Sequence, residues 1–567
     1  MAAPAPDPAQ LAALADALAA EGIALPPVAC QLLAARGHGT RDAAVRFLRP
    51  QRSHVEPAGA MADADRAVER LVAAIRGGEV ILVHGDYDVD GMTSTALLTR
   101  VLRSLGARTV VPWVPARADG YDLGPAGCAA ARRHGATLVV TCDCGTSAAG
   151  AIADLVASGI DVIVTDHHLP GGALPAALAV CNPRRPDCPS VDKDLAAVGI
   201  AYKLAVALCE AMGADANLAH QHLDLVALGT IADVAPLRGE NRVFAQVGLR
   251  IMQDAVAAKA GIRALVRSSG MEGKALTAGR VSFTLAPRLN AAGRVGDAKQ
   301  GLALLLADAD DEAHAMAREL EELNQARQGL DREVLEAALR QLDTPEQRDR
   351  HAFVLSGTGW HHGVIGIAAA RIVEHTARPA VMVTVDDAGI GKGSGRSIPR
   401  FDLHAALTSC AGHFLRFGGH RAAAGLTMEA ARLPAFAEQF DDVARVWLRP
   451  EDLVPELRID AELPLDAVDE SLERLLRRFE PFGVGNPAPL LCATGVAVAA
   501  PPRRIGSDGV RFAVEAGGST LEAIGWGLAA RAGELDPAHP VDLLFRLERD
   551  DYRGLSRMQL KVADMRR

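Results

Sequence analysis

Three aspartates stand at alternate positions in the segment VHGDYDVDG, and a histidine comes just before them. They are Asp86, Asp88 and Asp90, and the histidine is His84. An apolar run precedes the motif at residues 80–83, and a helix-like segment of small residues follows it. Carboxylates gathered at the end of a buried strand repel one another and lose hydration. The motif therefore predicts that positive charge is held among them.

Three further segments offer ligands of the same kind. They are CDCG with Asp143, TDHH with Asp166, His167 and His168, and GTIAD with Asp233. Each alone is also typical of a turn, a helix cap or a loop. Together they bring at least five carboxylates and two imidazoles to loops that lack enough cationic side chains to neutralise them. Two divalent ions, Mn²⁺ or Mg²⁺, would supply about four positive charges and accept these ligands. Two such metal ions side by side are suited to in-line hydrolysis of a phosphoester.

The elements around these motifs alternate between strand and helix. Strands are expected at residues 79–84, 108–114, 137–142 and 161–165, each followed by a segment rich in Ala and Leu. This order predicts a parallel α/β sheet whose active loops lie at the carboxyl ends of the strands. The acidic motifs all fall at these ends.

The remainder of the chain predicts two more domains. Residues 308–341 read as long connecting helices, and a second α/β pattern begins at His351. After Pro455, several short strands and one helix at residues 470–479 predict a small β-barrel of the OB type that grips single strands. The expected divisions are a helical lead-in (1–57), the first α/β domain (58–250), a helical connector with a basic loop (251–345), a substrate-binding α/β domain (346–450) and the barrel (455–567).

Composition sets outer limits on the function. The 567 residues suffice for three or four domains of about 150 residues, and no apolar run reaches the length of about 20 that a bilayer requires. The N-terminus lacks a basic segment typical of a signal peptide. Nine cysteines without a disulfide framework favour a reduced, cytoplasmic setting, and structural zinc at C-x-C is a weak alternative.

The net charge of −10 argues mildly against nucleic acid, but two local runs are basic and rich in Gly, Ser and Asn. One run is RVSFTLAPRLNAAGR, and the other spans GKGSGRS and FGGHRAAAGL. Arginine forks and free backbone N–H groups suit phosphate oxygens, although a solvated face or ordinary glycine turns would show the same pattern. The candidate phosphate-binding residues are Arg280, Arg288, Asn290, Arg294, Ser394, Arg396 and His420.

The four acidic motifs, in this order and spacing, resemble those of the DHH phosphoesterase superfamily. PRLNAAGR, WHHGVIGIAAARI, GKGSGRS, GGHRAAAG and FEPFGVGNPAP extend the resemblance to the RecJ family of bacterial single-stranded-DNA-specific exonucleases. The resemblance implies a DHH domain, a DHHA1-type domain and an OB-type domain. It also implies catalytic roles for Asp86, Asp88, Asp90, Asp143, His167, His168 and Asp233. Metal ligands would be His84, Asp88, Asp90, Asp143, His167 and Asp233, with Asp143 bridging the two ions and Asp166 orienting a ligand.

The resulting hypothesis is a 5′→3′ exonuclease that hydrolyses single-stranded DNA to 5′-mononucleotides by a two-metal mechanism, in DNA repair and recombination. Its expected partners are single-stranded DNA, a single-strand-binding protein and a RecQ-type helicase, with no membrane. One alternative is a phosphodiesterase for short oligonucleotides or cyclic dinucleotides, which would not need the region after Pro455. The other is a catalytically inactive DNA-binding module, which the intact ligand set disfavours.

Overall fold

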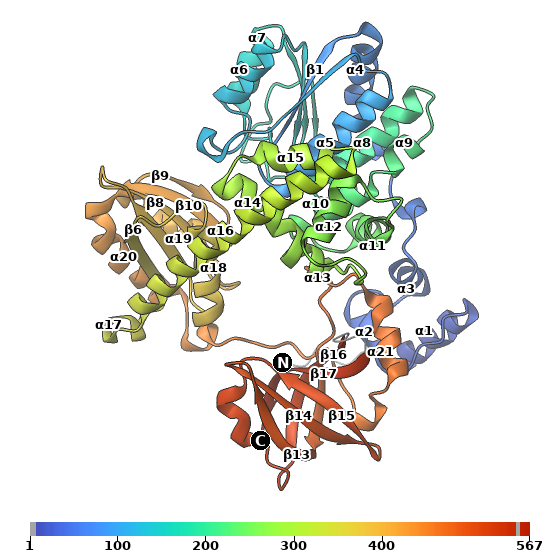
Figure 1. Cartoon of the computed structure of the whole chain (residues 1–567), viewed down its shortest axis with the longest axis vertical. Coiled ribbons are helices and arrows are strands. Elements are labelled where there is room, and N and C mark those ends of the chain that lie inside the picture. Colours follow the sequence, from blue (N-terminus) through green and yellow to red (C-terminus); the bar gives the residue numbers. More distant parts are fainter. Residues whose placement is uncertain (1–6, 551–555) are drawn as a thin grey trace.

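A five-stranded parallel sheet forms the centre of the N-terminal half of the protein (Figure 1). The computed structural model describes residues 7–550 and 556–567; the first six residues of the predicted lead-in and residues 551–555 of the predicted barrel lie outside the described residues. The strand order is β2-β1-β3-β4-β5. The strands are β1 (Val80–Gly85), β2 (Thr109–Trp113), β3 (Leu138–Cys142), β4 (Asp161–Thr165) and β5 (Ala179–Cys181), all parallel.

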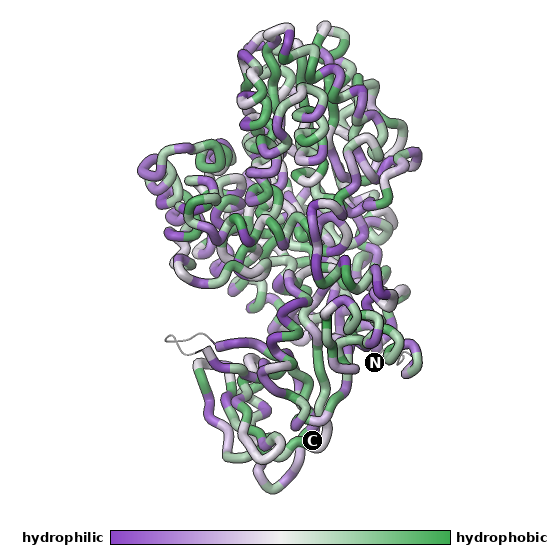
Figure 2. The backbone as a smooth tube through the Cα atoms, turned by 90° about the vertical axis from the view of Figure 1, so that its right-hand side faces the viewer, coloured by the Kyte–Doolittle hydropathy of each residue, from purple (hydrophilic) through white to green (hydrophobic). Residues whose placement is uncertain are grey.

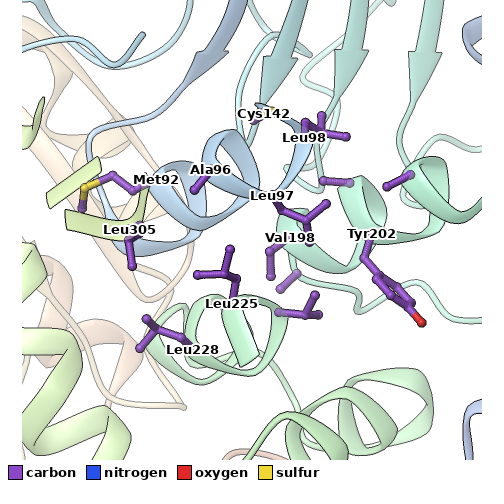
Figure 3. Close-up of a cluster of buried hydrophobic side chains, with 14 of the residues drawn as sticks. Met92, Ala96, Leu97, Leu98, Cys142, Val198, Tyr202, Leu225, Leu228 and Leu305 are labelled. Carbon is purple, nitrogen blue, oxygen red and sulfur yellow. The ribbon is translucent and has the colours of Figure 1, made fainter. Parts of the chain in front are cut away.

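Helices cover both faces of this sheet because its strands are apolar on both sides. Ile81 and Val83 contribute to a cluster with α4 (Ala64–Gly77), α5 (Val89–Ser104) and α8 (Ala197–Ala211). Leu82 and Val139 face the opposite side, with α6 (Pro125–Arg133) and α7 (Ala149–Ala157). Figure 3 shows the first cluster, where α5 packs between α8 and α10 (Leu223–Ala232). Parallel strands buried on both faces are the expected result of such hydrophobic runs.

Further helices extend this half toward the middle of the molecule. They are α9 (Asn217–His220), α11 (Gly239–Gln253), α12 (Ala260–Ser268), α13 (Ala278–Arg280), α14 (Ala286–Val295) and α15 (Ala298–Leu306), with a π-helical turn η4 (Val281–Leu285) between α13 and α14. The 33-residue helix α16 (Asp310–Leu342) then runs diagonally to the second domain, as Figure 1 shows. The predicted connecting helices are thus one continuous helix.

The second α/β domain has a mixed sheet in the order β6-β7-β8-β10-β9. Its strands are β6 (Phe353–Thr358), β7 (Ala380–Val385), β8 (Ile390–Arg396), β9 (Phe414–Gly419) and β10 (Ala423–Glu429), and among them only β6 and β7 pair in parallel. Its helices are α17 (Pro345–Arg348), α18 (Ile365–Thr376), α19 (Leu403–Ser409) and α20 (Leu433–Trp447). The basic segment GKGSGRS is strand β8, at the centre of this sheet.

The C-terminal domain is a seven-stranded sheet that curls back on itself. Its order is β11-β12-β16-β17-β15-β14-β13, and one residue, Ala497, separates β12 (Leu491–Val496) from β13 (Val498–Ile505). These consecutive strands pair near opposite ends of the sheet, so one bent strand brings the two ends together, as in a barrel. The other elements are β11 (Ala461–Glu462), α21 (Glu470–Leu476), β14 (Gly509–Ala516), β15 (Ser519–Gly525), β16 (Val541–Asp550) and β17 (Arg557–Arg566).

The N-terminal helices pack against this C-terminal domain. Leu18 and Leu33, from α1 (Pro8–Ala20) and α2 (Pro27–Ala35), share one hydrophobic cluster with Phe479 and Phe545; Phe47 of α3 (Arg41–Leu48) belongs to it as well. The N-terminal helices and the C-terminal strands therefore build one core, in the lower part of the molecule in Figures 1 and 2. Figure 2 shows that hydrophobic and hydrophilic stretches alternate along the backbone.

The structure confirms the predicted fold class: a parallel-sheet domain, a second α/β domain and OB-domain strands. Among the described residues, no helix combines the length and the apolar character that crossing a bilayer requires.

Candidate metal centre

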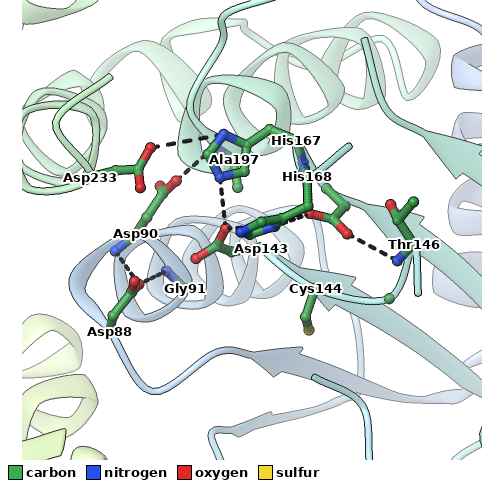
Figure 4. Close-up of polar contacts among 12 residues, drawn as sticks. Asp88, Asp90, Gly91, Asp143, Cys144, Thr146, His167, His168, Ala197 and Asp233 are labelled. Carbon is green, nitrogen blue, oxygen red and sulfur yellow. Dashed lines mark hydrogen bonds and ion pairs between the residues drawn. The ribbon is translucent and has the colours of Figure 1, made fainter. Parts of the chain in front are cut away.

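The carboxyl ends of β1, β3 and β4 bring the predicted ligands together (Figure 4). Asp88 caps α5, and its side chain accepts hydrogen bonds from the N–H groups of Asp90 (2.9 Å) and Gly91 (3.1 Å). A Cβ atom at position 91 would lie 2.4 Å from the backbone N of Asp86, so glycine lets α5 start directly against the end of β1. The short turn fixes the three alternate aspartates at one edge of the sheet.

Asp90 is held by the N-terminus of a second helix. Its carboxylate accepts hydrogen bonds from the N–H groups of Ala197 (2.8 Å) and Val198 (2.9 Å), where α8 begins. Burial and the neighbouring Asp88 raise the pKa of Asp90 to about 7 despite these bonds. The Asp90 oxygens are thereby fixed in position while their negative charge lacks a full partner.

Asp143 follows β3 in a left-handed backbone conformation, with φ of 64°. Its Oδ1 lies 3.1 Å from Nε2 of His167, and the Nδ1 of His167 lies 3.8 Å from Oδ2 of Asp233, which ends α10. Among the described residues, three groups have ligand atoms within 4.8 Å of one another: Asp143–His167–His168, Asp90–His167–Asp233, and Asp86–Asp88–Asp143. The second and third groups share no residue and meet at the contact between His167 and Asp143.

The donor set fits two divalent cations. Asp86 Oδ1, Asp143 Oδ1 and His167 Nε2 are buried and have no hydrogen-bond partner, although the last two atoms face each other. Burial and neighbouring aspartates raise the pKa values of Asp86, Asp143 and Asp233 well above the usual range. Divalent cations would neutralise the excess negative charge of these carboxylates. The buried carboxylate oxygens and the imidazole nitrogen that lack partners would serve as their ligands.

Asp166 orients its neighbours. Its Oδ1 accepts hydrogen bonds from the N–H groups of His167 (2.7 Å) and His168 (3.1 Å), and its Oδ2 accepts one from the Thr146 N–H (2.9 Å). Burial alone would raise the pKa of Asp166, but these bonds and the contact with the His168 ring hold it well below the usual range. The hydroxyl of Tyr121 lies 2.9 Å from Nε2 of His168. His168 is therefore fixed between Asp166 and Tyr121 at the rim of the centre.

His84, predicted as a ligand, lies apart from these groups. Its ring packs 4.7 Å from that of Trp113, and its Nδ1 lies 3.5 Å from the Cys144 sulfur. Because side chains alternate along β1, His84 points to the sheet face covered by α6, where a Cβ atom at position 127 would lie 2.6 Å from its Nε2. His84 belongs to none of the three groups found among the described residues, so this geometry does not support it as a metal ligand.

The cysteines beside Asp143 are buried thiols. Burial raises the pKa of Cys142 to about 12, and no cysteine belongs to the ligand groups in the described part of the chain. The nine cysteines are all buried and free, so the centre offers oxygen and imidazole ligands rather than thiolates.

The raised pKa of Asp90 predicts a pH-dependent stability difference in metal-free protein. Between about pH 4 and pH 7 folded Asp90 binds more protons than unfolded Asp90, so its contribution to the unfolding free energy falls as pH rises, by about 1.4 kcal/mol per pH unit. Buried histidines such as His167, whose pKa burial lowers to about 3, contribute the opposite slope. The measurement is therefore urea denaturation in chelator of wild type against Asp90→Asn. As pH rises from about 4 to 7, the unfolding free energy of the variant should increase relative to that of wild type. A difference between the two proteins that does not change with pH would contradict the prediction.

Three arginines without acidic partners lie close to one another, and two of them, Arg117 and Arg294, lie near Asp86 and Asp88. Arg117 donates to the Gly293 carbonyl (2.8 Å) and lies over the Tyr87 ring, while Arg294 donates to the Gly363 carbonyl (3.2 Å). Arg396 donates to the Ser394 hydroxyl (3.2 Å). Burial first, then the neighbouring Arg117 and other arginines, lowers the pKa of Arg294 to about 10. Within the described residues none of the three forms an ion pair with a carboxylate, so their guanidinium groups are available to bind an anion.

The other predicted phosphate-binding residues lie at different places. Arg288 pairs with Glu321 of α16, and Asn290 lies two residues further along α14. Arg280 lines a groove of about 790 Å³ between α11, α13 and the OB domain, together with Arg250, Arg546 and Lys561. Phe283, 84% exposed, lies on the π-helical turn between this groove and α14. Arg280 is thus part of the groove beside the OB domain rather than of the arginine cluster.

His420 reaches the centre from the second domain. It lines a pocket of about 370 Å³ with His167, His168, Asp233 and Arg184. The sequence reasoning missed Arg117, Tyr121 and Arg184. The loop PARADGYDLG, which carries Arg117 and Tyr121, directly follows a predicted strand of the sheet, and that position is the signal that could have drawn attention to it.

Comparisons with known proteins agree with this geometry. The model of the DHH family, N-terminal domain, matches residues 80–230, that of the DHHA1 domain residues 349–445 and that of the RecJ OB domain residues 459–564. The chain is 37% identical over 563 residues to the single-stranded-DNA-specific exonuclease RecJ of Salmonella typhimurium, covering 95% of this chain and 96% of that protein. It is 32% identical to RecJ of Bacillus subtilis over 96% of this chain and 68% of that protein.

Solved structures give the same result. The crystal structure of RecJ in complex with Mn²⁺ from Thermus thermophilus superposes with a TM-score of 0.84 at 34% identity, covering 100% of this chain and 79% of that chain. The Mg²⁺ complex from the same organism gives 0.79 at 32% identity, covering 100% and 78%. The fold, the order of the domains and the identity along nearly the whole length place this chain in the RecJ family of single-stranded-DNA-specific exonucleases.

Proposed function

We propose that this protein is a metal-dependent exonuclease that degrades single-stranded DNA from its 5′ end and releases 5′-mononucleotides. The observation that carries the proposal is the proximity of two chemistries at one edge of the parallel sheet. Hard metal ligands converge there, and two unpaired arginines lie near them, Arg117 near Asp86 and Arg294 near Asp88. Arg396, also unpaired, lies beside Arg294. A terminal phosphate satisfies such a cluster and brings the first phosphodiester bond to the carboxylates.

The ligand groups divide the work. Asp90, His167 and Asp233 would hold one divalent ion, and Asp86, Asp88 and Asp143 the other, with Asp143 between them. Mn²⁺ or Mg²⁺ held there would lower the pKa of the attacking water and stabilise charge on the leaving oxygen. Asp166 and Tyr121 hold the His168 ring toward the substrate side of the centre. The pocket of about 370 Å³ has the size of a small-ligand site, which suits one nucleotide.

The remainder of the strand has a path to the OB domain. The helical run from α13 through η4 to α14 links Arg280 in the groove with Arg294 in the arginine cluster. Phe283 projects from the middle of this run and offers a face on which a base can stack. A strand that lies along it with its 5′ phosphate on the arginine cluster and its 3′ part against the OB domain has the polarity that 5′→3′ degradation requires. The alternative phosphodiesterase for dinucleotides has no use for this groove.

The test compares one long strand labelled at either end. With Mn²⁺, the 5′ label should leave first as a mononucleotide, while the 3′-labelled strand shortens progressively and a blunt duplex resists. Internal cuts, early release of the 3′ label or activity confined to dinucleotides would contradict the proposal. The same proposal sets the protein in the cytoplasm, in DNA repair and recombination, and includes a single-strand-binding protein and a RecQ-type helicase as partners. Direct binding measurements with the purified proteins would test these partners.

A further inference from the structure

The metal ligand Asp233 begins a loop with an unusual backbone. We define the Asp233 loop as residues 233–238, between α10 and α11. Val234, its second residue, has φ of 60°, a left-handed conformation that a β-branched side chain rarely adopts. Val234 is also 56% exposed, so its own packing does not hold it there. Such strain persists only where the surroundings enforce it, and these surroundings include the C-terminal domain.

A loop of the C-terminal domain contacts the Asp233 loop directly. We define the OB loop as residues 482–486. The Leu237 N–H donates to the Val484 carbonyl at 2.7 Å, and Gly483 and Asn486 close the OB loop by bonding to each other. The Asn486 side chain is buried and donates to the carbonyls of Phe479 (2.8 Å) and Pro481 (2.9 Å). The OB loop is thus a turn held by its own hydrogen bonds, and its tip is hydrogen-bonded to the Asp233 loop.

Two glycines lie where the two loops touch. Gly485 has φ of 75°, and a Cβ atom there would lie 2.8 Å from Arg238 Nε and 3.1 Å from Pro236 Cβ. A Cβ atom at position 483 would lie 2.7 Å from the end of the Leu237 side chain. Any side chain at these positions therefore pushes on the three residues that follow the turn at Asp233.

The same scaffold supports Asp90. Asn241 is buried, and its side-chain amide donates to the carbonyls of Pro236 (3.2 Å) and Asp194 (2.6 Å). Its Oδ1 accepts a hydrogen bond from the Ala196 N–H (3.4 Å), and the next two N–H groups along the chain bind the Asp90 carboxylate. The positions of both carboxylates of the Asp90–His167–Asp233 group are therefore held by one network of hydrogen bonds, which extends to the OB loop.

We infer that the OB loop is a positioning element for the metal centre, which sets the affinity of the Asp90–His167–Asp233 group for its ion in addition to any role of the C-terminal domain in binding DNA. The inference rests on the proposed function, since it assumes that this group holds a metal. It makes the C-terminal domain matter even for substrates too short to reach it. Groups that support metal ligands typically change metal affinity about tenfold to a hundredfold when altered.

The experiment measures Mn²⁺ binding to the full chain by titration calorimetry without DNA, for Gly485→Ala and a matched control. The control is Gly518→Ala, because Gly518 also has a left-handed backbone, with φ of 83°, and no atom lies within 4 Å of the added Cβ. Both variants carry the same backbone strain, and only the first disturbs the Asp233 loop. Gly485→Ala should weaken Mn²⁺ binding about tenfold, and Gly518→Ala should match wild type. Cleavage of a short oligomer should need correspondingly more Mn²⁺ and return toward the wild-type rate at saturation.

A milder variant keeps the test decisive if Gly485→Ala fails to fold, as judged by circular dichroism. Gly483→Ala meets only the flexible end of Leu237, so it should fold and weaken binding by a smaller factor. Equal Mn²⁺ affinity in the folded Gly485 or Gly483 variant and in the Gly518 control would overturn the inference. A wild-type protein that binds no Mn²⁺ would instead refute the proposed function itself, so the two failures are distinguishable.

Discussion

Asp143→Asn should abolish cleavage of single-stranded DNA while the protein stays folded. Asp143 lies between the two ligand groups: its Oδ1 is 3.1 Å from Nε2 of His167, and one of its carboxylate oxygens lies within 4.8 Å of a carboxylate oxygen of Asp86 and of Asp88. Loss of its charge should disrupt both ion sites, and we expect kcat/KM to fall about a thousandfold or more. Asparagine is chosen because it tolerates the left-handed backbone of Asp143 better than alanine does.

The metal-free stability of the variant separates lost chemistry from lost structure. Burial and repulsion by Asp88 and Asp90 raise the pKa of Asp143, so removing its charge should leave the metal-free protein at least as stable as wild type. Mn²⁺ should raise the melting temperature of wild type and have a much smaller effect on Asp143→Asn. The surface variant Asp154→Asn, which loses only an exposed pair with Arg132, should behave as wild type in both measurements. Wild-type turnover in Asp143→Asn would refute the assigned ligand set.

The elements that carry the ligands could be predicted because their signals are local. Apolar runs such as residues 80–83 and 162–164 are separated by only one or two residues from an aspartate of an acidic motif, and parallel strands bring such ends to one edge. The structure accordingly brings together Asp86, Asp88, Asp90, Asp143, His167 and Asp233. His84 shows the limit of this reasoning. His84 is the last residue but one of β1. Because side chains alternate along the strand, it lies on the sheet face that carries Leu82 and Val139, away from the aspartates.

Contacts between distant segments left no signal in the sequence. Arg117 is a single arginine in a loop, and only the fold places it beside Arg294 and Arg396. The packing of α1 and α2 on the C-terminal strands joins residues more than four hundred positions apart, which no periodicity could reveal. Arg280 shared a basic segment with Arg294, but the helical run between them carries the two arginines to separate sites. Local pattern thus predicted which side chains converge on the candidate metal centre, whereas the arrangement of the arginine cluster depended on tertiary packing.

Arg117→Ala and Arg396→Ala should each remove the preference of the enzyme for 5′-phosphorylated strands. Each guanidinium would make a charge-assisted contact with the terminal phosphate worth about 1.5–3 kcal/mol. We therefore expect kcat/KM on phosphorylated strands to fall about ten- to a hundredfold, with little change on 5′-hydroxyl strands. Mn²⁺ affinity should be unchanged, because neither residue belongs to a ligand group.

Lysine at either position should restore only part of the loss, since an ammonium keeps the charge but lacks the planar fork.

Two further arginines serve as controls. Arg416, exposed on β9, should tolerate alanine on every substrate. Arg280→Ala should weaken the binding of long strands more than that of short ones. The effect should be larger at low salt, because phosphate contacts in the groove act by releasing counterions. This variant should keep the preference for 5′-phosphorylated strands. The measurement is the ratio of kcat/KM on matched 5′-phosphate and 5′-hydroxyl strands. If Arg117→Ala and Arg396→Ala keep the wild-type ratio while Arg280→Ala loses it, the 5′ end lies in the groove beside the OB domain, and the polarity proposed for the bound strand is reversed.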